Sequence, residues 1–162
     1  MSISFRTGFY AGLGFALVLG AYLIFLWLPE HQIQSHTENL FQAIENKNWE
    51  RMAEFFGDDY HDQWGYDRVG VLEHSREVFR FLRDLRVHTS RVIIRIDGRT
   101  AYWTGRIDIS AGESEFSGAI KERIHSLKQP FTLEWHRVSA KPWDWKLVRV
   151  SNPELEIPEK GY

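Results

Sequence analysis

Between Arg6 and Glu30 the sequence contains no charged side chain, and residues 7–29 are mostly aliphatic and aromatic. A transmembrane helix needs about 20 apolar residues to cross the ~30 Å hydrocarbon core of a bilayer. We therefore predict that residues 7–29 form one membrane-spanning helix behind a short tail, residues 1–6. The lipid bilayer is then the first expected partner of this chain.

A cleaved signal peptide is the alternative interpretation of this segment. Such a peptide has a shorter apolar core, followed by small residues at the cleavage site. Here the segment ends in the bulky run Ile24–Pro29, which favours an uncleaved signal anchor. Arg6 precedes the segment and Glu30 follows it, so the positive-inside rule places the N-terminus in the cytoplasm. The domain that follows is expected on the outer side, which is the periplasm in a bacterium.

Small residues recur at every fourth position of the same segment, at Gly8, Gly12, Ala16 and Gly20. This spacing places them on one face of a helix, where small side chains let two membrane helices approach closely. The face would then contact a second copy of the chain or another envelope protein. The alternative is that glycine is simply common in membrane spans.

Composition limits what the rest of the chain can be. A content of 43% hydrophobic and 15% aromatic residues predicts a folded domain, and a net charge of −2 gives no reason to propose a nucleic-acid partner. The sequence has no cysteine, so disulfides and thiol chemistry are excluded. Neither a cofactor nor a metal site is predicted, because no phosphate loop or zinc motif is present and the seven histidines lack ligand spacing.

Two helices are expected first in the domain. Residues 30–35 are interpreted as a polar linker, residues 36–152 as the domain and residues 153–162 as an irregular tail. Ser35 and Glu38 fit a capping box, which predicts a helix start. The apolar face of that helix extends to a stop at Gly57 and contains Leu40, Phe41, Ile44, Met52, Phe55 and Phe56. Asp67 is predicted to cap a second helix, whose apolar stripe is Leu72, Val78, Phe79, Leu82 and Leu85.

From about Arg86 the apolar period changes from 3.6 to 2, which predicts strands. Val92, Ile94 and Ile96 alternate with charged residues, and Asp97-Gly98 indicates a hairpin turn into a second strand over residues 101–109. A short helix is expected around Ile120 and Ile124, followed by strands over residues 131–139 and 143–151. Helices followed by an antiparallel sheet predict an α+β fold.

The order of these elements resembles the NTF2-like (SnoaL-like) superfamily. The resemblance covers roughly residues 36–150 and rests on Asp59-Tyr60 after the first helix, Asp97-Gly98 between strands and Trp145–Val150 in the last strand. It implies an α+β cone behind the membrane helix, in which helices cover a curved antiparallel sheet and a pocket lies at the wide end. The superfamily contains isomerases, dehydratases and hydrolases as well as binding modules, so the fold alone does not decide the activity.

Enzymes of this kind need a carboxylate or histidine base in an apolar pocket, with a tyrosine or acid nearby. The segment Tyr60–Asp62, which includes His61, supplies candidates for these catalytic groups. The expected pocket-lining or binding residues are Trp64, Trp103, Trp135, Arg137, Trp145 and Arg149. Arg137 and Arg149 share the strand alternation of the tryptophans, and an inward arginine would favour an anionic ligand.

Structural roles compete with each of these assignments. An aspartate in such a segment is commonly a cap or an ion-pair partner, and Tyr60 can be a core aromatic. The tryptophans can fill the space between sheet and helices, and the arginines can extend to the rim of the sheet. The first hypothesis is therefore a membrane-anchored binding or assembly module without catalytic activity. The alternative is a membrane-tethered isomerase, dehydratase or hydrolase acting on a small hydrophobic molecule.

Overall fold

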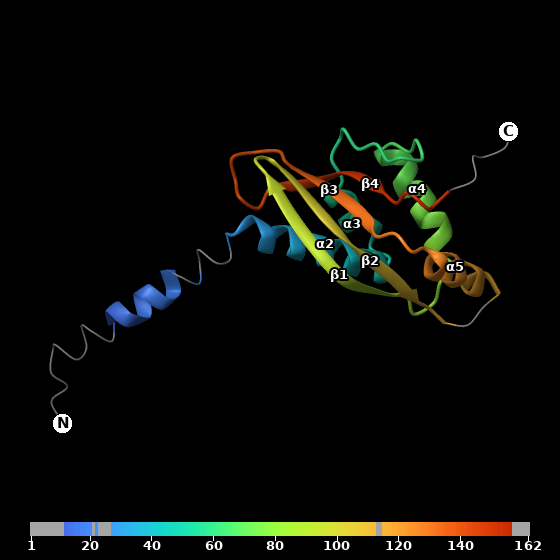
Figure 1. Cartoon of the computed structure of the whole chain (residues 1–162), viewed down its shortest axis with the longest axis horizontal. Coiled ribbons are helices and arrows are strands. Elements are labelled where there is room, and N and C mark those ends of the chain that lie inside the picture. Colours follow the sequence, from blue (N-terminus) through green and yellow to red (C-terminus); the bar gives the residue numbers. More distant parts are fainter. Residues whose placement is uncertain (1–11, 21, 23–26, 113–114, 157–162) are drawn as a thin grey trace, which may run out of the picture.

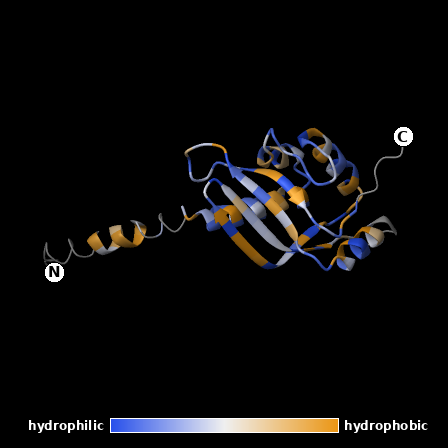
Figure 2. Ribbon diagram, turned by 45° about the horizontal axis from the view of Figure 1, so that its top comes forward, coloured by the Kyte–Doolittle hydropathy of each residue, from blue (hydrophilic) through white to orange (hydrophobic). Residues whose placement is uncertain are grey.

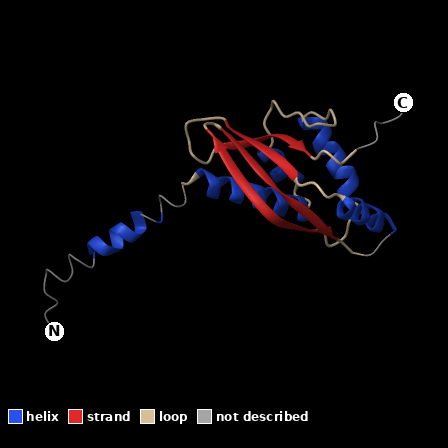
Figure 3. Ribbon diagram, in the orientation of Figure 1, coloured by secondary structure: helices blue, strands red, loops and turns tan. Residues whose placement is uncertain are grey.

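The computed structural model describes residues 12–20, 22, 27–112 and 115–156. Its elements follow in the order α2 (Pro29–Glu45), α3 (Trp49–Phe55), α4 (Arg68–Phe79), β1 (Arg86–Asp97), β2 (Thr100–Ser110), α5 (Glu115–Ser126), β3 (Phe131–Arg137) and β4 (Trp145–Ser151) (Figure 1). The strands form one antiparallel sheet in the order β1-β2-β3-β4, and α2 and α3 lie against it (Figure 3). The predicted α+β class and the antiparallel meander are therefore confirmed.

The predicted membrane segment is described only in part. Residues 12–20 are helical, and residues 12–19 are exposed. Residues 7–11, 21 and 23–26 of the segment, including Gly8, lie outside the described residues. Gly12, Ala16 and Gly20 belong to the described helix, and that stretch is mostly apolar (Figure 2). Within the described ranges, no helix is both long and apolar enough to cross a bilayer.

The first helix of the domain begins earlier than the sequence predicts. Pro29 occupies the first turn of α2, where its fixed φ suits a helix and its missing N–H costs nothing. Residues 30–35 are therefore helical, and the predicted polar linker is wrong. The predicted capping box is also wrong, because Ser35 lies inside α2 and the Glu38 carboxylate accepts a hydrogen bond from the Gln34 amide at 2.6 Å.

The long helix predicted up to Gly57 is interrupted between α2 and α3. Lys47 adopts a positive φ of 54°, which no right-handed helix permits. Asn48 then caps α3, its side chain accepting a hydrogen bond from the Arg51 amide at 3.1 Å. The apolar residues on both sides of the break still face one core, so their period alone does not reveal it.

The remaining elements follow the sequence pattern closely. Asp67 caps α4, and its carboxylate accepts a hydrogen bond from the Gly70 amide at 2.7 Å. Gly98 has a φ of 58° in the turn between β1 and β2, a conformation that glycine adopts without a steric penalty. The stripe predicted for α4 extends too far, because the helix ends at Phe79 and Leu82 and Leu85 pack beyond it against Ile109.

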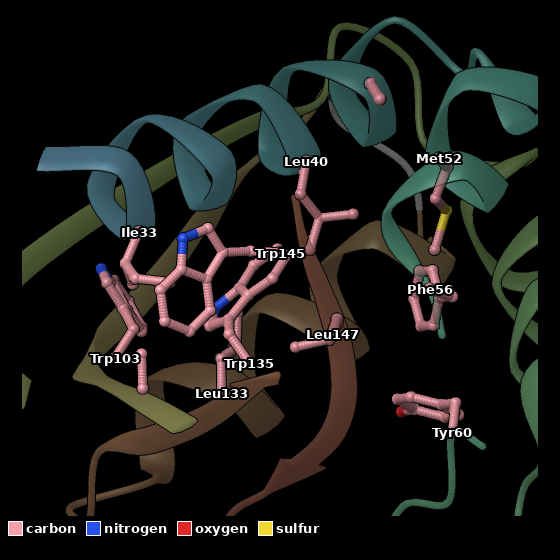
Figure 4. Close-up of a cluster of buried hydrophobic side chains, with 12 residues drawn as sticks. Ile33, Leu40, Met52, Phe56, Tyr60, Trp103, Leu133, Trp135, Trp145 and Leu147 are labelled. Carbon is pink, nitrogen blue, oxygen red and sulfur yellow. The ribbon is translucent and has the colours of Figure 1, made fainter. Parts of the chain in front are cut away.

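Three fully buried indole rings occupy the core beneath α2. Trp103, Trp135 and Trp145 are at most 2% exposed, and Figure 4 shows them gathered near Ile33. The His36 ring packs edge-on against Trp135, with centroids 5.9 Å apart. Burial among these rings lowers the pKa of His36.

A β-bulge in β4 corrects the predicted side of Arg149. Glu134 pairs with Arg149 and Trp135 pairs with Leu147, so Val148 is the additional residue in the strand. A bulge reverses the inward and outward alternation on its far side. Arg149 consequently lies on the exposed face of the sheet, opposite Glu134, and does not share the face of Trp145 and Leu147.

Candidate functional site

A cavity of about 270 Å³ lies between the helices and the sheet. Its wall is mostly hydrophobic and includes Phe41 and Ile44 from α2, Leu133 from β3 and Val150 from β4. The cavity exists because the indole rings fill only one part of the space under α2. In the view of Figure 4, Met52, Phe56 and Tyr60 stand apart from the tryptophan cluster. Pockets of this shape and polarity are typical of small-molecule sites.

Tyr60 supplies a hydroxyl group at the polar end of this cavity. The residue follows α3, is 1% exposed and packs edge-on against Phe56 at a centroid distance of 4.8 Å. Its hydroxyl donates a hydrogen bond to Asp62 Oδ2, with an oxygen–oxygen distance of 3.4 Å. Burial, reinforced by the Asp62 carboxylate, raises the pKa of Tyr60 far above its ordinary value. The hydroxyl therefore stays protonated and remains a donor at neutral pH.

Asp62 holds the loop that closes this end of the cavity. Its Oδ1 accepts hydrogen bonds from the backbone amides of Trp64 and Tyr66, both at 2.9 Å. Aspartate commonly forms such bonds to amides that follow it, because its short side chain reaches its own backbone. One carboxylate oxygen is thus occupied by the loop, and only Oδ2, beside Tyr60, remains for other contacts. The geometry assigns Asp62 a positioning role for Tyr60.

His74 on α4 contributes another polar group to the wall. Its ring stacks on Tyr66 with centroids 5.1 Å apart and an interplanar angle of 18°. Its Nδ1 is buried, and no hydrogen-bond partner for that atom occurs among the residues that the structure describes. Buried polar atoms are nearly always paired, so an unpaired nitrogen in a cavity-lining residue makes His74 the candidate partner for a polar ligand group.

The chain after β4 covers part of the same cavity. Leu155 lines it, and the Trp64 indole Nε1 donates a hydrogen bond to the Leu155 carbonyl at 2.6 Å. Asn152 is fully buried, and its Oδ1 accepts hydrogen bonds from the amides of Glu154 and Leu155. Residues 153–156, predicted as the start of an irregular tail, are therefore held in place against the 62–66 loop.

The structure brings together only some of the residues named from the sequence. Tyr60, Asp62 and Trp64 line the cavity, while His61 is exposed beside it. Other residues expected at the pocket lie elsewhere, namely Trp103, Trp135, Arg137, Trp145 and Arg149. The three tryptophans are core residues, the Arg137 guanidinium lies 5.6 Å from the Trp145 ring, and Arg149 faces outward.

Sequence reasoning missed Tyr66, His74 and Ser75 as lining residues. His74 lies one helical turn after Gly70, on the same side of α4 as Val71, which also lines the cavity. A polar residue within the apolar stripe of a helix was the available signal. No group of three metal-ligating side chains occurs in the part of the chain that the structure describes.

Comparison with solved structures finds proteins of the same fold. A protein from Streptomyces avermitilis, provisionally named a dehydratase of the NTF2-like family, aligns with a TM-score of 0.56 and 16% identity over 75% of this chain and 93% of its own. A protein from Novosphingobium aromaticivorans, provisionally named an aromatic ring hydroxylase, aligns with a TM-score of 0.56 and 14% identity over 73% of this chain and 82% of its own. The domain has the NTF2-like fold.

The same fold also matches part of one longer protein. It matches the protein Bd1075 of Bdellovibrio bacteriovorus with a TM-score of 0.56 and 14% identity over 74% of this chain. That alignment spans only 38% of the Bdellovibrio protein. No family model matches the sequence, and no curated protein matches it. These likenesses establish the NTF2-like fold, and the function has to be argued from the cavity.

Proposed function

We propose that this chain is a membrane-anchored module whose NTF2-like domain binds a small, mostly apolar molecule in the cavity beside Tyr60 and His74. The anchor in this proposal is the uncharged segment 7–29, which has the length and composition of a membrane span. The observation that carries the binding proposal is an apolar cavity whose lining includes His74, a residue with a buried Nδ1 that has no hydrogen-bond partner among the described residues.

The size and polarity of the cavity define the class of ligand. An engineered apolar cavity of about 150 Å³ holds benzene, so about 270 Å³ suits a molecule of one or two rings. No lysine or arginine lines the cavity among the described residues, and Asp62 brings negative charge to it. An anion would lose its hydration there without gaining a counter-charge. The proposed ligand is therefore neutral.

The polar end of the cavity suits one hydroxyl or carbonyl group. With its proton on Nε2, His74 accepts a hydrogen bond at Nδ1, and with the proton on Nδ1 it donates one. A ligand group that pairs with this nitrogen removes the cost of an unpaired polar atom, which is about 1–3 kcal/mol. A phenol therefore fits the site better than an unsubstituted ring of the same size.

An enzyme is the second candidate, and the unpaired His74 nitrogen is the observation that favours it. A histidine in an apolar pocket can take a proton from a substrate or give one to it. Proteins with this fold that are provisionally named dehydratase or ring hydroxylase make such chemistry a reasonable alternative. If His74→Gln still bound the ligand but no longer converted it to product, the result would support an enzyme and not a binding module.

The binding proposal is tested with two matched probes, fluorobenzene and 4-fluorophenol. The full chain is reconstituted in phosphatidylcholine nanodiscs, and binding is measured by ¹⁹F NMR against empty nanodiscs, which report partition into lipid alone. We expect both probes to bind, and the phenol about fivefold more tightly, which corresponds to one net hydrogen bond of ~1 kcal/mol. His74→Leu should remove this preference while leaving fluorobenzene binding in place.

A matched pair of variants on α4 controls for the cavity itself. Val71 lines the cavity, whereas Val69 on the same helix is 61% exposed. Val71→Trp should fill the cavity and abolish binding of both probes, and Val69→Trp should leave binding unchanged. Equal signals from wild-type and empty nanodiscs, or wild-type binding in Val71→Trp, would refute the proposal.

A further inference from the structure

Exposed apolar side chains gather at the end of the domain where α2 begins. Trp143 and Val138, in the connection between β3 and β4, are each 51% exposed. Trp27 and Leu28, immediately before α2, are 57% and 44% exposed. Large aromatic side chains left in water at one end of a domain indicate a contact surface when they occur together.

The connection between β3 and β4, residues 138–144, lies beside the first turns of α2. Figures 1 and 2 both show it reaching the level at which α2 starts. The backbone of Trp143 lies near enough to the His36 ring to act on its pKa. His36 is about 10 Å along the helix from Pro29 at 1.5 Å per residue. The loop therefore stands within about two helical turns of the uncharged segment 7–29.

Internal hydrogen bonds give this loop a defined shape. The Val138 amide donates to the Asp144 carbonyl at 2.9 Å, and the Trp145 indole donates to the Pro142 carbonyl at 2.8 Å. The neighbouring turn is tied to it, because the Arg99 guanidinium donates to the Arg137 carbonyl at 2.8 Å. Exposure of Val138 and Trp143 is thus a property of a well-bonded loop.

We propose that loop 138–144 docks onto the lipid–water interface of the membrane that anchors the chain, with Trp143 and Val138 among the headgroups. This inference rests on the anchor in the proposed function and is independent of the ligand in the cavity. The interfacial layer on each side of the hydrocarbon core is about 5–7 Å deep, and tryptophan is enriched there. A second contact near the anchor fixes the orientation of the domain relative to the bilayer.

We expect loop 138–144 to be attracted to the membrane mainly by partition of the Trp143 ring into the interface, and not by net charge. Arg99 and Lys141 are exposed at this end, and both suit lipid phosphates. Glu30 and Asp97 are also exposed there, and Asp144 is half-buried, so the basic residues have no excess over the acidic ones. Docking is therefore expected on neutral phosphatidylcholine as well as on membranes that also contain phosphatidylglycerol.

The absence of cysteine makes a direct test possible. Val138→Cys and Val69→Cys each place a single thiol at an exposed valine, the second on α4, far from the start of α2 in Figure 1. Each full-length variant is labelled with bimane and reconstituted into phosphatidylcholine vesicles, with flotation to verify association. At position 138 we expect the bimane fluorescence to be quenched by brominated lipid and protected from aqueous iodide. At position 69 we expect it to be quenched by iodide and unaffected by brominated lipid. Adding Trp143→Ser to Val138→Cys should restore quenching by iodide.

Each other outcome contradicts the inference in a recognisable way. Iodide quenching of equal strength at both positions would mean that the loop stays in water. Protection at position 138 from both quenchers would indicate contact with protein instead of lipid. Failure to float with the vesicles would overturn the anchor and this inference together, while the ¹⁹F measurement would still report on the cavity.

Discussion

At the scale of single residues, similar side chains have very different roles in this chain. Trp135 is fully buried and Trp143 is half exposed, although both belong to the same pair of strands and their connection. The difference follows from alternation, since Trp135 lies on the inward face of β3 and Trp143 lies in a loop. The same residue type therefore contributes to the core at one position and to the surface at the other.

Truncation should separate these two roles in stability measurements. Trp135→Ala should lower the free energy of unfolding by about 3–5 kcal/mol, because it leaves a large cavity among packed rings. Trp143→Ala should lower it by no more than ~0.5 kcal/mol. The measurement is a urea unfolding midpoint on residues 27–162, which keep the first turn of α2. Similar losses in the two variants would contradict the described packing of Trp135.

At the scale of elements, two irregularities in the sheet determine which residues face the helices. Val148 is the additional residue in β4, and Arg91 lies in a register shift between Ser90 and Ile93 in β1. Arg91 has a φ of 53°, a left-handed conformation that costs a side-chain-bearing residue ~1–2 kcal/mol. This shift places Val92 on the inward face, together with Ile94 and Ile96.

A pair of glycine substitutions tests the conformation of Arg91. Arg91→Gly relieves the left-handed strain, and this gain offsets the flexibility that glycine adds to the unfolded chain. We expect the free energy of unfolding, measured by urea titration, to stay the same or to rise by as much as ~1 kcal/mol. Arg95 is also exposed on the same strand and has no positive φ, so Arg95→Gly should cost ~0.5–1 kcal/mol. Equal losses would show that Arg91 carries no strain.

Local patterns predicted most of the elements because their signals are local. Asp97-Gly98 and the alternating isoleucines define a hairpin, and Asp67 marks the start of α4 without reference to the rest of the chain. The break at Lys47 was not predicted, because neither glycine nor proline marks it. The outward side of Arg149 was not predictable either, since its bulge is defined only by pairing with β3.

Prediction of the candidate site was harder, because the site is formed by contacts between residues that are distant in the sequence. Tyr60 and Asp62 could be named from the sequence because they follow a helix as a polar cluster. The sequence signal for His74 was weaker, because a single histidine on an amphipathic helix is usually a surface or core residue. His74 is a candidate because its ring stacks on Tyr66 and the residue lines the cavity, and both features arise only in the folded chain.

At the scale of the whole molecule, the proposed anchor determines on which side of the membrane the domain works. Arg6 on one side of the segment and Glu30 on the other predict a cytoplasmic N-terminus. A reporter enzyme that is active only outside the cytoplasm should therefore be active when fused after Tyr162. A fluorescent protein that matures only in the cytoplasm, fused at the same position, is the matched control. Fluorescence without enzyme activity would reverse the orientation.

The cavity should also affect how the domain unfolds under hydrostatic pressure. Hydrostatic pressure favours the state of smaller volume, and unfolding removes internal voids from a protein. The part of this cavity of about 270 Å³ that water does not fill should therefore make the domain sensitive to compression. A molecule that occupies the void takes away that volume difference, so a bound ligand should raise the pressure at which the domain unfolds.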